Sequence, residues 1–332
     1  MRSIDIHTHV LPPELPPGSP VRLEHIDECK ARMVRADGTL FREIESSCWD
    51  PLRRLRECDE AGVGVQVLST VPVMLAYSAP VGPAHDAARF LNDHIASLCQ
   101  KHPRRFAGLG TLPMQAPDLA VRELERCVRE LRLAGVQIGS HVGSWNLSDA
   151  PVFPVFERAA SLGAAVFVHP WDMMGQERMP KYWLPWLVGM PAEGALAICS
   201  VILGGVLERL PRLRIAFAHG GGAFPGTLGR IEHGFHARPD LVAVDNPGKP
   251  PSKYLERIYV DSLVHDARAL RLLLDVFGPE RIALGSDYPF PLGEEKPGAL
   301  IASMNFPAPV LDRLRAGTAL EWLGRDAGSY DL

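Results

Sequence analysis

Two histidines lie two residues apart near the N-terminus, within the apolar run Ile4–Val10. Side chains at alternate positions of a β-strand point to the same side, so His7 and His9 project together if this run is a strand. Two imidazoles presented in this way can share one divalent metal ion. Because a lone His-x-His pair is more often a surface accident, we expect a metal site only if other strand ends supply further ligands.

Three more polar side chains end apolar, strand-like runs, and these are His169, His219 and Asp287. Taken singly, they could be a core histidine, part of a bare glycine turn and a helix N-cap. In a (β/α)8 barrel, however, the carboxyl ends of all strands open on one face, so these side chains would meet the histidine pair there. Three imidazoles and one carboxylate suit a divalent transition metal, zinc first. One histidine then remains for proton transfer.

The rest of the chain alternates between strand and helix patterns, which indicates a parallel sheet. Eight strands are the number that closes a (β/α)8 barrel. A doubly wound open sheet is the alternative, but no Gly-x-Gly-x-x-Gly follows a strand, which disfavours a dinucleotide-binding fold. The expected strands span residues 4–10, 65–70, 106–111, 135–139, 164–170, 214–219, 258–261 and 281–287, and the expected helices span 50–61, 84–101, 116–133, 151–162, 191–210, 223–236 and 267–277, followed by two or three helices in the tail.

Residues 11–50 depart from this alternation. The proline-rich stretch Leu11–Gly18 cannot form a regular helix. Ala36–Thr39 is a turn signal between two short strand-like pieces, 32–34 and 40–42. We therefore predict a single barrel domain over residues 1–332, with an inserted flap at about 11–50 that lies over the end of the first strand.

Composition restricts the classes of partner. The chain has 332 residues, 46% of them hydrophobic, and a net charge of −4, so we expect binding neither to nucleic acid nor to an anionic membrane. The apolar run Gly194–Leu207 is too short to span a bilayer and is typical of a buried helix. The N-terminus lacks the apolar core of a signal peptide, and the six cysteines are scattered without a Cys-x-x-Cys pair. Reduced thiols and a cytoplasmic location are expected.

Motifs at the strand ends resemble the amidohydrolase superfamily. They are Ile6–His9, Phe167–Pro170, Ala218–Gly221 and Gly285–Pro289. Longer segments narrow the resemblance to its decarboxylases of the kynurenine branch of tryptophan breakdown, and it runs over nearly the whole chain, most weakly at residues 14–35 and in the last fifteen or so. These longer segments are Leu68–Met74, His169–Met174, Tyr182–Glu193 and Asp287–Glu294.

The resemblance implies zinc-dependent, non-oxidative decarboxylation of an unsaturated dicarboxylate semialdehyde. His219 would be the acid/base that deprotonates the zinc-bound water and returns a proton to the product. Hydroxide addition beside the leaving carboxylate and direct protonation of that carbon by His219 both remain open. The single zinc would be held by His7, His9, His169 and Asp287.

The resemblance also implies how a substrate is held. Arg42 and Arg230 would bind substrate carboxylates, for which an arginine fork is well suited. Arg230 would come from the neighbouring subunit, so the active form is expected to be a homodimer. Met173, Trp186 and Phe290 would line the pocket.

One strand residue restricts the metal count, and two other functions compete. Many superfamily hydrolases bridge two metals through a lysine or glutamate of the fourth strand, whereas this strand carries Gln137, a poor bridging ligand, so one metal is expected.

A hydrolase with the same centre, such as a lactonase or amidase, is the first alternative function, since fold alone does not decide activity. A catalytically idle scaffold is the second, and the intact ligand set argues against it.

Overall fold

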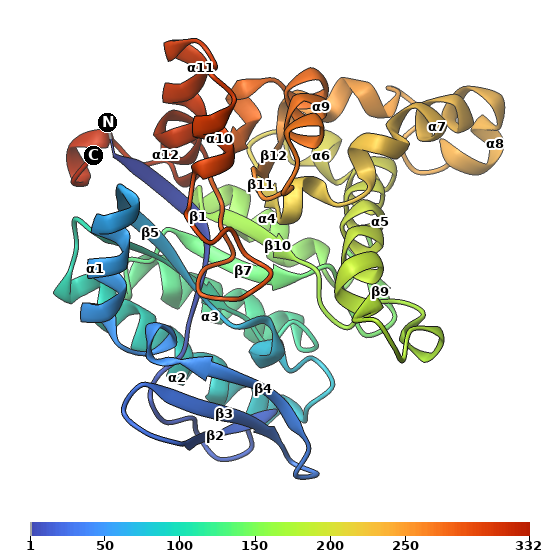
Figure 1. The fold of residues 1–332 in the computed structure, drawn as a ribbon. Coiled ribbons are helices and arrows are strands. Elements are labelled where there is room, and N and C mark those ends of the chain that lie inside the picture. The colour runs from blue at the N-terminus through green and yellow to red at the C-terminus, as the bar shows by residue number, and fades with distance from the viewer. Residues whose placement is uncertain (1) are drawn as a thin grey trace.

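The computed structural model describes residues 2–332. Eight parallel strands form one sheet in which each strand pairs with the next along the chain. Backbone hydrogen bonds also join its two edges, because the Ile6 N–H donates to the Leu284 carbonyl at 2.9 Å. The sheet thus closes into the predicted (β/α)8 barrel (Figure 1). In order, the strands are β1 (Ser3–Val10), β5 (Val63–Thr70), β6 (Phe106–Thr111), β7 (Gly135–Gly139), β10 (Ala165–His169), β11 (Arg214–Phe217), β12 (Ile258–Asp261) and β13 (Ile282–Ala283).

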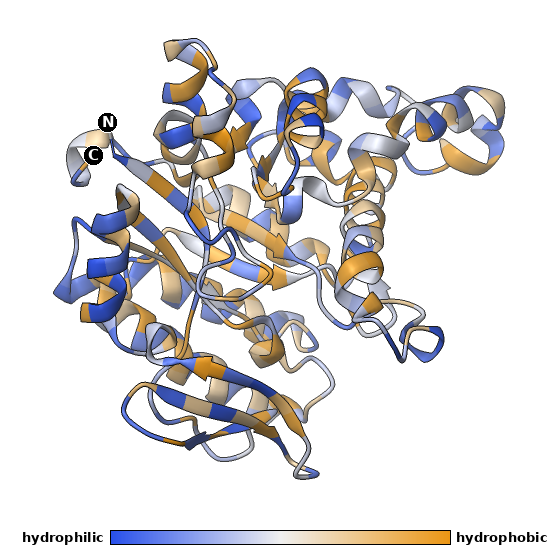
Figure 2. Ribbon diagram, in the orientation of Figure 1, coloured by the Kyte–Doolittle hydropathy of each residue, from blue (hydrophilic) through white to orange (hydrophobic). Residues whose placement is uncertain are grey.

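Helices surround the barrel and follow its strands, largely as predicted. The barrel strands are mainly hydrophobic, whereas the outer helix α1 is largely hydrophilic (Figure 2). This pattern is expected for parallel strands that are covered on both faces. The helices are α1 (Pro51–Ala61), α2 (Val81–Lys101), α3 (Pro117–Arg129), α4 (Phe153–Leu162), α5 (Met190–Leu203), α6 (Val206–Arg209), α7 (Phe224–Ala237), α8 (Pro239–Val242), α9 (Ala267–Phe277), α10 (Ala299–Ser303), α11 (Ala308–Asp312) and α12 (Thr318–Leu323).

Two predicted elements are corrected by the structure. The single helix expected over 191–210 is broken into α5 and α6, because Gly205 adopts a left-handed φ of 69° that an α-helix cannot include. The last strand, expected over 281–287, is regular only over Ile282–Ala283. Beyond it the chain still bonds to β1, but Asp287 has a φ of 59°, which ends any strand there.

The inserted residues 11–50 carry a three-stranded antiparallel sheet, with β2 (Val21–His25), β3 (Lys30–Arg35) and β4 (Leu40–Glu45). The sheet lies at one side of the barrel, between the end of β1 and the start of α1 (Figure 1). Its buried side chains, among them Met33 and Ile44, share one apolar cluster with Val71 and Met74, which follow β5. This packing fixes β4, and with it Arg42, beside the carboxyl ends of the barrel strands. A further short hairpin, β8 (His141–Val142) and β9 (Trp145–Asn146), follows β7.

One stretch, Pro185–Leu203, is long and apolar enough to cross a bilayer by length and composition alone. It comprises a single π-helical turn, Pro185–Gly189, and α5. In its most apolar window 44% of the residues are buried inside the structure, among them Ile198 and Ile202 of the main core. Core helices of globular proteins share this composition, so the stretch alone does not identify a membrane segment.

Candidate metal centre

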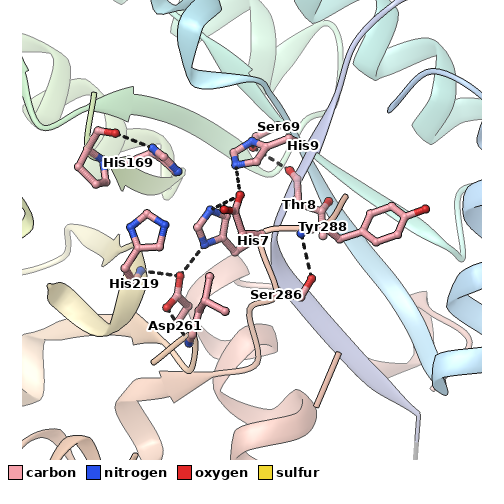
Figure 3. A network of polar contacts seen from close by, with 12 residues as sticks. His7, Thr8, His9, Ser69, His169, His219, Asp261, Ser286 and Tyr288 are labelled. Carbon is pink, nitrogen blue, oxygen red and sulfur yellow. Dashed lines mark hydrogen bonds and ion pairs between the residues drawn. The ribbon is translucent and has the colours of Figure 1, made fainter. Parts of the chain in front are cut away.

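Four side chains from three distant parts of the chain meet at the carboxyl end of the barrel. One nitrogen or oxygen of each lies within 4.8 Å of the corresponding atom of every other. Figure 3 shows the imidazoles of His7, His9 and His169 turned toward one another, with His219 beside them. The four residues are the predicted ligand set His7, His9, His169 and Asp287.

The facing atoms of this cluster lack partners of their own. The Nε2 atoms of His7 and His9 are buried without a hydrogen bond to any described residue. They lie 3.6 Å and 3.1 Å, respectively, from Oδ1 of Asp287. Buried polar atoms are almost always paired, so two orphaned nitrogens aimed at one carboxylate call for a missing partner. A divalent metal ion fits this position.

The outer nitrogen of each imidazole fixes the tautomer that a metal requires. In all three rings Nδ1 faces an oxygen that only accepts hydrogen bonds, so Nδ1 must carry the proton. The lone pair of Nε2 then points into the cluster, which is the arrangement found around protein-bound metals. The acceptors are the Asp261 carboxylate for His7 (2.7 Å), the Thr70 carbonyl for His9 (3.1 Å) and the Pro170 carbonyl for His169 (2.9 Å).

The charges of the cluster also match ligand chemistry. Burial lowers the pKa of His9 and lowers that of His169 well below its usual range, so both rings are neutral near pH 7. Burial alone would raise the pKa of Asp287, but the adjacent imidazoles of His9 and His7 hold it well below its ordinary value. Burial would lower the pKa of His7 as well, but the hydrogen bond with Asp261 and the nearby carboxylates raise it. A metal binds neutral imidazole and ionised carboxylate, so its entry would release a proton from His7 but not from His9 or His169.

His219 lies beside the four-residue cluster rather than within it. Its ring centre is 5.0 Å from that of His169 and 5.1 Å from that of His7. Its Nδ1 is buried with no hydrogen-bond partner among the described residues, and burial lowers its pKa to about 4. A neutral imidazole with an unengaged nitrogen at this distance is suited to accept or deliver a proton next to a metal-bound reactant.

The cluster borders a narrow cavity that is partly open to solvent. His9, His169 and Asp287 line it together with Arg42 and several aromatic side chains, among which are the predicted Trp186 and Phe290. A second cavity shares Trp186 with the first, and His219 lies on its wall. The proton-transfer candidate therefore lines the cavity that adjoins the one bordered by the cluster.

Arg42 is a cation without a counterion. Its guanidinium stacks over the Phe290 ring at 4.4 Å and lies 5.3 Å from the Phe41 ring. No carboxylate of the described residues comes within ion-pair distance of it, and burial lowers its pKa. A desolvated arginine that faces a cavity is stabilised by an anion that enters that cavity.

Two of the predicted substrate contacts do not lie at this cavity within one chain. Arg230 is exposed on α7 and lines neither cavity. In Figure 1, α7 projects away from the barrel beside α8. Met173 is only 4% exposed and packs against Gly189, and it is absent from the walls of both cavities. Substrate contact by either residue stays a prediction.

Sequence reasoning missed several residues that hold the site. Asp261 is the last residue of β12, as His169 is of β10, and this shared position is the sequence signal for it. Asp5 shares the alternation of His7 and His9, and its carboxylate accepts a hydrogen bond from Ser286 Oγ at 2.5 Å, which fastens the last strand to the first. Burial raises the pKa of Asp5 to about 7.

Gln137 supports the expectation of a single metal. Its side-chain oxygen accepts a hydrogen bond from Ser69 Oγ at 2.7 Å, and its side-chain nitrogen donates to the Thr70 carbonyl at 2.9 Å. Both polar ends are thus engaged on the inner side of the barrel. Within residues 2–332, no second cluster of three or more histidine, cysteine, aspartate or glutamate side chains has ligand spacing.

Comparison with known proteins agrees with this geometry. A family model described as Amidohydrolase matches residues 4–325. The chain belongs to the amidohydrolase family. A 2-amino-3-carboxymuconate-6-semialdehyde decarboxylase from Dictyostelium discoideum is 54% identical, over 98% of this chain and 93% of its own. The protein of that name from Caenorhabditis elegans is 40% identical, over 90% and 88% of the two chains. The crystal structure of 5-carboxyvanillate decarboxylase from Sphingomonas paucimobilis superimposes with a TM-score of 0.77 at 29% identity, over 85% of each chain.

Proposed function

We propose that this amidohydrolase-family chain is a metal-dependent decarboxylase. Its substrate would be 2-amino-3-carboxymuconate 6-semialdehyde, and its products 2-aminomuconate 6-semialdehyde and carbon dioxide. The similarity to two proteins named for that activity, at 54% and 40% identity over nine-tenths or more of this chain, supports the choice of substrate. That substrate would place the chain in the kynurenine pathway of tryptophan degradation.

The structural observation that carries the proposal is the pairing of Arg42 with the metal cluster in one cavity. The half-buried Arg42 has no counterion among the described residues and would bind a carboxylate of the substrate, while the neighbouring ligand set would activate its reactive end. Phe290 and Trp186 line the same cavity and can contact the flat conjugated chain of such a substrate.

The reaction consumes one proton. The carbon–carbon bond to the leaving carboxylate breaks, its electron pair remains on the substrate carbon, and that carbon takes up a proton, so no oxidant or reductant is needed. A divalent metal would act as a Lewis acid and acidify water at this position. We assign the proton transfer to His219, whose ring is neutral and unengaged within about 5 Å of the ligand imidazoles.

We further propose that the metal is zinc, one ion per subunit. Three neutral imidazoles and a carboxylate form a four-ligand nitrogen and oxygen set that zinc favours. Manganese also binds imidazole and carboxylate, although the affinity order of such sites places zinc well above it. Metal analysis of chain purified without added metal distinguishes the two ions.

A homodimer would complete the substrate site. The exposed Arg230 lies on α7, and Leu241 of the adjoining α8 and Val244 just beyond it are 63% and 66% exposed. We propose that this arm meets a second copy of the chain and delivers Arg230 to the neighbour's cavity. Mixing Arg42→Ala and Arg230→Ala subunits should then partly restore activity, because one cavity of the mixed dimer regains both arginines. Absence of recovery, once subunit exchange is demonstrated, would count against the shared site.

The catalytic proposal is tested by removing the metal with a chelator and adding zinc back, while the absorbance of the semialdehyde is followed. We expect loss of turnover on chelation and recovery with zinc, without NAD, oxygen or pyridoxal phosphate. Turnover of lactones or amides instead of the semialdehyde would establish the alternative, a hydrolase with the same centre. We also propose a cytoplasmic location, since all six cysteines are free, and cell fractionation tests it.

A further inference from the structure

Asp261 is a fully buried carboxylate at the end of β12 that receives four hydrogen bonds. Its Oδ2 accepts from the His7 ring at 2.7 Å and from the His219 N–H at 2.9 Å. Its Oδ1 accepts from the Gly220 N–H at 2.8 Å and from the Leu263 N–H at 3.1 Å. Figure 3 shows this carboxylate between the side chain of His7 and the backbone of His219. One group therefore holds a metal-ligand candidate and the proton-transfer candidate together.

We propose that Asp261 is a positioning residue that couples metal binding at His7 to the placement of His219. This inference rests on the proposed function, in which His7 binds the metal and His219 moves the proton. Asp261 lines neither cavity and acts through the two histidines. It keeps the proton of His7 on Nδ1, so that Nε2 remains available to the metal.

The backbone around His219 needs such an anchor. His219 has a φ of 56°, and the three glycines that follow it also lie in the left-handed region, with φ of 61°, 75° and 63°. A non-glycine residue in this region is held there only by its surroundings. The bonds from the His219 and Gly220 N–H groups to the two carboxylate oxygens supply that restraint. They fix the direction in which the His219 ring leaves the chain.

Only a carboxylate of this length satisfies all four donors. Each oxygen of Asp261 accepts two hydrogen bonds, one pair from His7 and His219 and the other from Gly220 and Leu263. Asparagine has the same shape but a single acceptor oxygen. In either orientation its amide NH₂ would face two N–H donors, so one pair would be left unsatisfied inside the protein. Asp261→Asn therefore changes the hydrogen bonds with almost no change in volume.

The matched control is Glu123→Gln. Glu123 is also buried, at 1% exposure, and its carboxylate pairs with Arg126 of the same helix, α3, and accepts a hydrogen bond from Asn92 of α2, away from the metal cluster. Both variants remove one buried negative charge and keep the side-chain shape. Any effect that follows only from losing a buried carboxylate should appear in both.

The experiment begins with metal affinity, measured by competition between apo-protein and a chromogenic zinc chelator. Asp261→Asn should bind zinc about 10- to 100-fold more weakly, as is typical when the partner of a metal-ligating histidine is lost. Glu123→Gln should bind zinc as the unchanged chain does. Equal affinity of Asp261→Asn and the unchanged chain would overturn the proposal.

The second readout is turnover at saturating zinc, compared in the His219→Ala background. Asp261→Asn alone should lower kcat even when the metal site is full. Combined with His219→Ala, it should lower kcat little further, since its effect on turnover passes through His219. Multiplicative losses in the double variant would refute the coupling to His219.

A third readout uses the unchanged chain, so it tests the coupling between zinc binding and the His219 segment even if Asp261→Asn fails to fold. Zinc addition should slow amide hydrogen exchange in a peptide spanning 214–224. When His7 binds zinc, Asp261 becomes less mobile, and so do the N–H groups of His219 and Gly220 that donate hydrogen bonds to it. Exchange that is indifferent to saturating zinc would overturn the coupling. The affinity and exchange measurements need no substrate. A chain that does not decarboxylate the semialdehyde would contradict the proposed reaction, but these two measurements would still test the role of Asp261.

Discussion

Arg42 is expected to favour substrate binding but to lower the folding stability of the substrate-free chain. Burial lowers the pKa of this guanidinium, and no carboxylate of the described residues pairs with it. Replacing it by methionine keeps the apolar stem, which lies against Phe290, and removes the desolvated charge. The change should raise the free energy of unfolding of the substrate-free chain by about 1 kcal/mol.

The same change should impair substrate recognition. A hydrogen bond between a charged donor and a charged acceptor contributes about 1.5–3 kcal/mol. Its loss predicts a fall in kcat/KM of about 10- to 150-fold, since each 1.36 kcal/mol is tenfold in rate. The fall should appear mainly as a higher KM if the bond is made equally in the ground state and the transition state.

Steady-state kinetics on the semialdehyde and urea unfolding of the apo-protein together measure both effects. Arg35→Met is the matched control, since Arg35 also stacks on Phe41, at 4.7 Å, but is exposed and lines no part of the cavity. It should leave kcat/KM unchanged. A less stable Arg42→Met chain with an unchanged kcat/KM would show that Arg42 is structural and would refute the reasoning.

Three further predictions concern other parts of the chain. Burial would raise the pKa of Glu321, but hydrogen bonds led by that from Arg313 lower it from 4.5 to about 2. The ionised Glu321 therefore contributes about 1 kcal/mol, after solvent screening, to the free energy of unfolding above pH 4.5, and this contribution is lost as the pH falls toward 2. In Glu321→Gln the free energy of unfolding by urea should fall less between pH 4.5 and pH 2. An unchanged fall would contradict this contribution. Gly135→Ala should prevent folding, since its Cβ would collide with the β10 backbone, while Gly82→Ala, in open space, should fold normally by circular dichroism. His219→Ala should retain zinc and lose most turnover, and loss of zinc would make His219 a ligand.

The clustering of His7, His9, His169 and Asp287 could be predicted from sequence because these residues lie at or near the ends of recognisable strand patterns. His7, His9 and His169 follow alternating or wholly apolar runs, and a barrel brings every such end to one face. Asp287 joins this cluster even though its predicted strand is regular only over Ile282–Ala283. Its N–H donates to the His7 carbonyl of β1 at 2.8 Å, and this bond places Asp287 at the cluster beyond the end of β13.

Other features depend on tertiary contacts that sequence patterns do not encode. Asp261 ends its strand as His169 does, but the four donors that it receives come from segments far apart in the chain. The break between α5 and α6 depends on the left-handed conformation of Gly205. The sequence alone does not show which backbone angle a glycine within an apolar helical pattern adopts. The missing counterion of Arg42 becomes visible only once all of its neighbours are placed.

The most direct test of the central claim is a zinc titration of the apo-protein, with carbon dioxide release from the semialdehyde measured at each step. We expect release that rises linearly and levels off at one zinc per subunit, with one carbon dioxide formed for each semialdehyde consumed. Release that needs two ions per subunit would contradict the single four-ligand site. Full release by metal-free protein would contradict the metal-dependent reaction itself.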